Sequence, residues 1–183
     1  IPALKQKNRR FFQEPVVLDM MALLQLVNNP HQDFLLIRFL EKKLNQRQLK
    51  RLMDAKSQVE SASVSLDSSD SKAKKRDVCS LFKVLCALSD SALCPELPHA
   101  VRLALVNLTE EILKARQNVQ FGETVYTVFE LADRIGLIAP DAPQDEQVAA
   151  RALLSTFKKL LYHLCKTAQF TPSLAEILDT LSA

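Results

Sequence analysis

The sequence predicts an all-α protein, and three observations lead to this prediction. Leucine supplies 31 of the 183 residues. The only two glycines are Gly122 and Gly136, which argues against turn-dense β architectures and against glycine-rich phosphate loops. Apolar residues recur at helical spacing through most of the chain. With 48% hydrophobic and 25% charged residues, the chain is long enough to bury a core and too apolar for a disordered tail.

We expect seven or eight antiparallel-packed helices, forming either an irregular helical bundle or a short HEAT/armadillo-like stack of helix pairs. No fixed repeat period supports the second alternative, which therefore rests on helix lengths and short links alone. The chain is expected to be a single domain, 1–183, or two lobes, 1–60 and 77–183. A flexible loop rich in serine and lysine, 61–76, would join these lobes.

In the first third, prolines mark helix starts, because proline is tolerated at the first helical position. A largely buried helix is expected from Pro15, and its inward stripe is Val17, Met20, Leu24 and Val27. Asn29 is then expected to cap a second helix from about Pro30 to Leu44, whose inward residues are Phe34, Ile37, Leu40 and Leu44. Asn45 either caps a third helix or lies within a continued second one.

The remaining helices follow similar signals. Asp77 is expected to cap a helix that carries Leu81, Phe82, Leu85 and Leu88, and Pro98 to open a long helix that reaches about Asn118. Gly136 is expected to stop the next helix in a left-handed conformation. The clearest pattern runs from Ala150 to Ala168, after an acidic lead-in at Asp145 and Glu146, and Ser173 begins a last helix.

No catalytic, cofactor-binding or metal-binding residues are predicted. Common hydrolase, zinc-protease, phosphate-loop and calcium-loop motifs do not occur in the sequence. The histidines His31, His99 and His163 are far apart, and two of them follow a proline at an expected helix start. The cysteines Cys79, Cys86, Cys94 and Cys165 fall in or beside apolar helical patterns, so we expect reduced thiols and a cytoplasmic or nuclear location.

Basic residues supply the candidate binding site. Residues 1–60 hold 11 basic and 6 acidic side chains, whereas 119–183 hold 5 and 8. Lys43, Arg47 and Lys50 have the spacing of one solvent face of a helix, so these residues and Arg51 are the predicted contacts for an acidic ligand. The alternative is an ordinary solvated flank, because no aromatic residues are interleaved with these charges.

Phe11 and Phe12 leave two alternatives open. They are expected either to form a docking edge for a partner or to staple the start of the first helix.

These features predict a non-catalytic protein–protein interaction domain, a scaffold or adaptor that presents a groove between helices to a peptide or helix of another protein. The alternative is a helical domain that binds nucleic acid through its basic first third. We expect no membrane span, because no run of 18 uncharged apolar residues occurs. The start at Ile1-Pro2 leads us to expect a segment of a larger intracellular protein.

Overall fold

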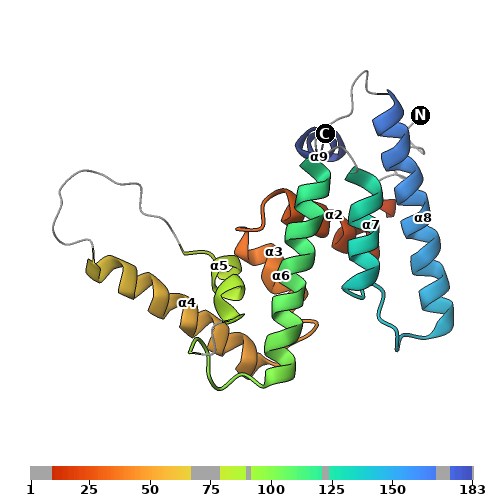
Figure 1. Ribbon diagram of the computed structural model, residues 1–183. Coiled ribbons are helices and arrows are strands. Elements are labelled where there is room, and N and C mark those ends of the chain that lie inside the picture. The colour runs from red at the N-terminus through yellow and green to blue at the C-terminus, as the bar shows by residue number, and fades with distance from the viewer. Residues whose placement is uncertain (1–9, 67–78, 90–91, 121–123, 168–173, 183) are drawn as a thin grey trace. The chain divides into compact units, whose positions relative to one another are not determined.

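The computed structural model describes residues 10–66, 79–89, 92–120, 124–167 and 174–182. These residues form eight α-helices and one 3-10 turn, and they contain no strand. The all-α prediction is therefore confirmed, and an irregular bundle is consistent with the arrangement in Figure 1. The repeat-like stack stays a prediction.

The chain divides into two compact units. Unit 1 comprises residues 1–28 and 111–183, and unit 2 comprises residues 29–110. This division does not follow the expected lobes, because residues 29–60 and 79–110 belong to the same unit. The long helix α6, His99–Gln120, contributes its first half to unit 2 and its second half to unit 1.

Unit 1 is built around α2, which packs against α7, α8 and α9. The four helices are α2 (Pro15–Asn28), α7 (Thr124–Arg134), α8 (Gln144–Thr167) and α9 (Leu174–Ser182). All four residues of the predicted α2 stripe are buried. Phe157 of α8 is 0% exposed, and its ring lies 6.4 Å from each of the rings of Phe11, Phe12 and Phe129. Phe11 and Phe12 therefore pack against α8 of their own chain.

Helix α7 begins and ends in unit 1, and its end follows the prediction. Gly136 has φ +67°, and its N–H donates to the carbonyl of Asp133 at 3.1 Å. The N–H of Leu137 donates to the carbonyl of Ala132 at 2.9 Å. These two bonds form a Schellman motif, in which a left-handed residue satisfies the last helical carbonyls.

Unit 2 contains α3 (Asp33–Leu40), α4 (Gln46–Leu66), α5 (Leu81–Cys86) and the 3-10 turn η1 (Ala87–Ser89). Helix α5 packs against both α3 and α4. Leu81, Phe82, Leu85 and Leu88 are buried, as predicted. Helix α5 is capped by Ser80, whose hydroxyl accepts a hydrogen bond from the Lys83 N–H at 3.3 Å. The expected cap, Asp77, lies outside the described residues.

The second expected helix is wrong at both ends, and its expected buried face is correct only for Leu40 and Leu44, which are buried. The side chain of Asn29 accepts a hydrogen bond from the His31 N–H at 3.2 Å, so this stretch forms a turn, and α3 begins at Asp33. Leu35, Leu36, Phe39 and Leu40 are buried, whereas Phe34 is 70% exposed. Packing against α5 selects this face, because α3 is apolar at nearly every position and has no unique apolar stripe.

Asn45 resolves the open alternative between one helix and two. Its side chain accepts a hydrogen bond from the Gln48 N–H at 2.9 Å, and the Gln48 side chain accepts one from the Asn45 N–H at 3.0 Å. This reciprocal capping box starts a separate helix, α4. Helix α4 extends to Leu66, so residues 61–66 are not part of a loop as expected. The rest of the expected loop, 67–76, lies outside the described residues.

Candidate protein-interaction surface

The predicted basic site lies at the corner between α3 and α4 in unit 2. Arg47, Lys50 and Arg51 belong to α4, but Lys43 lies in the turn before this helix. The prediction that Lys43, Arg47 and Lys50 line one helix face is therefore wrong, because the capping box at Asn45 interrupts the helix between them. The three side chains are exposed, and no ion pair is seen for them in the described part of the chain.

Arg51 differs from its neighbours because it has a structural partner. Its guanidinium forms an ion pair with the Glu96 carboxylate at 2.9 Å and donates to the Glu96 carbonyl at 2.9 Å. These contacts hold α4 against the segment that leads into α6. Lys43, Arg47 and Lys50 are therefore the predicted contacts that are exposed without such a partner in the described part of the chain, while Arg51 already pairs with Glu96. Exposed charges alone contribute little binding free energy.

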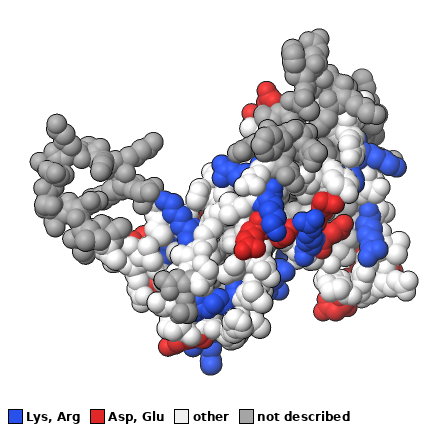
Figure 2. All heavy atoms as spheres, viewed as in Figure 1, with Lys and Arg blue, Asp and Glu red and all other residues white. Residues whose placement is uncertain are grey.

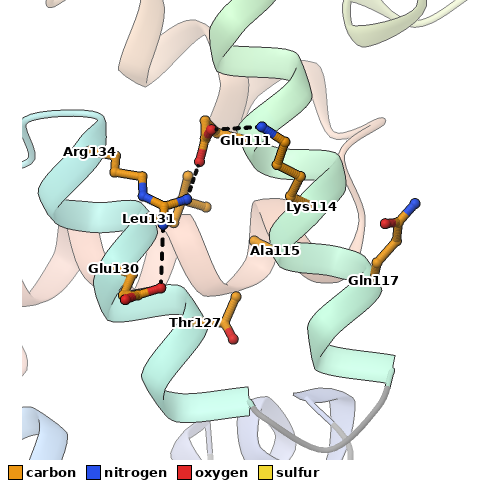
Figure 3. Close-up of a pocket in the computed structure, with 8 residues that line it drawn as sticks. All are labelled: Glu111, Lys114, Ala115, Gln117, Thr127, Glu130, Leu131 and Arg134. Carbon is orange, nitrogen blue, oxygen red and sulfur yellow. Dashed lines mark hydrogen bonds and ion pairs between the residues drawn. The ribbon is translucent and has the colours of Figure 1, made fainter.

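A small hollow lies between the second half of α6 and α7 in unit 1 (Figure 3). Its volume is about 180 Å³, and it is lined by four charged residues together with Ala115, Gln117, Thr127 and Leu131. Glu111 accepts bonds from Arg134 at 2.6 Å and from Lys114 at 3.2 Å, and Arg134 also lies 3.5 Å from Glu130. The Arg134 bond lowers the pKa of Glu111. The two carboxylates and the two cations therefore offset each other's charge, and the ion pair between Arg134 and Glu111 links α7 to α6.

A second surface combines α7 and α8, and sequence reasoning did not find it. Tyr126 of α7 is 56% exposed, and Tyr162 of α8 is 42% exposed. The ammonium of Lys158 lies 5.5 Å from the ring centre of Tyr126 and 5.4 Å from that of Phe129. Both distances are within the range of cation–π attraction. We call the surface formed by Tyr126, Lys158 and Tyr162 the α7–α8 face.

The pKa of Tyr126 is raised by neighbouring residues of both α7 and α8. A hydrogen bond to the Glu130 carboxylate is the main cause of the raised pKa of Tyr126, and Tyr162 raises it further through charge interaction. The ammonium of Lys158 on α8 lies over the rings of Tyr126 and Phe129 on α7 and so links the two helices. Figure 1 shows α7 and α8 side by side, and the two helices pack against each other.

Of the predicted thiols and histidines, Cys79 is buried and Cys94 is half-buried, whereas Cys86, His31, His99 and His163 are exposed. Cys79, Cys86 and Cys94 are free, and burial raises the pKa of each thiol. The side chain of Cys165 lies outside the described residues. The His31 ring is 2.6 Å from the Ser80 hydroxyl. No group of three or more histidine, cysteine, aspartate or glutamate side chains suited to a metal ion occurs among the described residues.

Basic and acidic side chains are interspersed on the face shown in Figure 2, with no broad field of either sign. Within the described ranges, no helix is both long and apolar enough to cross a bilayer. No protein-family model matches this chain, no curated protein is significantly similar to it, and no solved structure matches it significantly.

Proposed function

We propose that this chain is a non-catalytic interaction domain, a scaffold or adaptor segment of a larger protein, and that it binds another protein through the α7–α8 face. One observation carries this proposal, namely the exposure of Tyr126 and Tyr162 at one surface, with Lys158 beside them. Tyrosine offers a large contact area with few rotatable bonds, and tyrosines are enriched among the residues that dominate binding free energy in interfaces. A single exposed aromatic side chain is common on a protein surface, whereas two exposed tyrosines on one surface are less common.

A non-catalytic role is supported by the arrangement of the charged residues in the hollow. Glu111, Glu130, Lys114 and Arg134 form ion pairs with one another and join α6 to α7. A general acid or base needs a carboxylate aimed at a substrate, whereas these carboxylates are directed at cations of their own unit.

The corner between α3 and α4 is the second proposed contact, for an acidic ligand, through Lys43, Arg47 and Lys50. Its support is the exposure of these three cations and the lack of acidic residues in the first turn of α4, so the helix dipole adds to the same positive potential. The free thiols support a reducing compartment, the cytoplasm or nucleus.

The proposal is tested by affinity purification of the full-length parent protein in three forms. The forms are wild type, Y126S/Y162S and F34S, the last removing a more exposed aromatic ring from unit 2. We expect a partner that is retained by wild type and F34S and lost by Y126S/Y162S, followed by direct binding of the purified pair. An unchanged set of partners in Y126S/Y162S would overturn the proposal.

A further inference from the structure

The exposed side of α8 has the residue spacing of a helix-packing seam. Val148, Ala152, Ser155, Lys159 and Tyr162 are all exposed and are separated by four, three, four and three residues. This is the heptad spacing that places residues along one line of a helix. Val148 is 62% exposed. The opposite side of the same helix carries the buried residues Leu154, Phe157 and Leu161.

Charge is distributed unevenly along α8. After Asp145 and Glu146 in its first turn, the helix has no acidic residue. Its basic residues in that stretch are Arg151, Lys158, Lys159 and Lys166. Arg151 lies beside the seam and Lys159 within it, and both are exposed, so a partner that fits this face carries acidic residues beside its apolar ones.

From this complementarity we infer that the α7–α8 face binds an acidic amphipathic helix of another protein, laid along the seam of α8. The inference rests on the function proposed above and adds the chemistry and form of the partner. The seam from Val148 to Tyr162 contains 15 residues and is about 21 Å long, so the partner contributes about four helical turns. Val148 and Tyr162 take its apolar residues, while Arg151 and Lys159 pair with its carboxylates.

A second copy of this chain fits the seam less well. An antiparallel pair of α8 helices that matches Val148 with Tyr162 of the second copy also places Arg151 opposite Lys159. Like charges facing each other oppose association. A single-stranded nucleic acid is also disfavoured, because the Glu130 carboxylate lies beside Tyr126, where a base would stack.

The test uses two fluorescein-labelled helical peptides of about 15 residues that share a leucine seam, one flanked by glutamates and the other by lysines. A labelled single-stranded oligothymidylate is the third probe. Binding to the purified full chain is measured by fluorescence anisotropy. The variant R151E/K159E is compared with R38E/K83E, which makes the same change of charge at exposed positions of α3 and α5 in unit 2. The neutral variant R151Q/K159Q and circular dichroism spectra control for folding.

We expect the acidic peptide to bind. The variant R151E/K159E should weaken its binding by about ten-fold or more, R151Q/K159Q by less, and R38E/K83E by less than about two-fold. The inference is overturned if the two peptides bind equally, if R38E/K83E has the larger effect, or if the acidic peptide does not bind. It is also overturned if the oligonucleotide binds more tightly, or if sedimentation shows a dimer that R151E/K159E alters. If Y126S/Y162S loses the cellular partner but R151E/K159E keeps it, the inference of an acidic helical partner is overturned and the function proposed above stands.

Discussion

The carboxylate of Asp33 accepts a hydrogen bond from the ammonium of Lys56 at 2.7 Å, and this contact joins the start of α3 to the middle of α4. The second oxygen of Asp33 accepts the backbone N–H of Leu81 at 2.8 Å, at the first residue of α5. One side chain therefore ties three helices of unit 2 together. The side chains of Asp33 and Lys56 are 24% and 19% exposed, so water screens their attraction only in part.

Replacing Asp33 with asparagine is expected to lower the free energy of unfolding by about 1–3 kcal/mol, because a charged acceptor of two bonds is lost. Urea denaturation followed by circular dichroism measures the change. Asp54→Asn, on the exposed side of α4, serves as the control and should have little effect. Equal stability of wild type and D33N would show that the contact does not hold unit 2 together.

The same pair predicts a dependence on alkaline pH. The hydrogen bond to Asp33 is the main cause of the raised pKa of Lys56. A raised folded-state pKa stabilises the fold fully below the unfolded value of about 10.4, and this stabilisation is lost as the pH rises through the folded-state pKa. Above about pH 10 the stability advantage of wild type over D33N should therefore shrink. A constant difference from neutral pH to strongly alkaline pH would contradict this assignment.

Gly136 has a left-handed backbone conformation that disfavours residues with a side chain. A Cβ there meets no atom within 4 Å, so Gly136→Ala tests the left-handed φ alone. The expected loss is about 1–2 kcal/mol, and Gly136→Asn should lose less because asparagine tolerates this conformation. Thermal unfolding of the two variants supplies the comparison. If alanine were as stable as glycine, the Schellman motif would not be the end of α7.

Phe157 is expected to be the most sensitive single residue of unit 1. It is fully buried and lies among Phe11, Phe12 and Phe129. Phe157→Ala should lower the free energy of unfolding by about 3–5 kcal/mol. Tyr162→Ala on the same helix should change it by less than about 0.5 kcal/mol, because Tyr162 faces solvent. A small effect of F157A in urea denaturation would place the core of unit 1 elsewhere.

The sequence was sufficient to predict the helical class, the buried stripe of α2, part of the buried stripe of α8 (Leu154, Phe157 and Leu161), and the stop at Gly136, because each depends on neighbours along the chain. It did not predict the exposure of Phe34, since α3 is apolar on several sides and packing against α5 selects the buried one. It also missed the helical state of residues 61–66 at the end of α4. Serine composition favours a loop, but hydroxyls can donate within a helix, as Ser61 does to the Ser57 carbonyl at 2.8 Å.

The contacts in the candidate sites were also not predicted from the sequence, because they join residues that are distant along the chain. The partner of Arg51, Glu96, lies 45 residues away in the sequence, so local charge spacing did not reveal it. Tyr126 and Lys158 are likewise distant in sequence and meet only because α7 packs on α8. Periodicity identifies the exposed side of one helix, but it does not indicate which exposed residues of two helices form one surface.

Site-specific photocrosslinking tests most directly the claim that another protein binds at the α7–α8 face. A benzophenone amino acid replaces Tyr162 or, as a control, Phe34 in the protein expressed in cells. A specific adduct with another protein is predicted at position 162 and not at position 34. An adduct at position 34 alone, or at neither position, would contradict the claim.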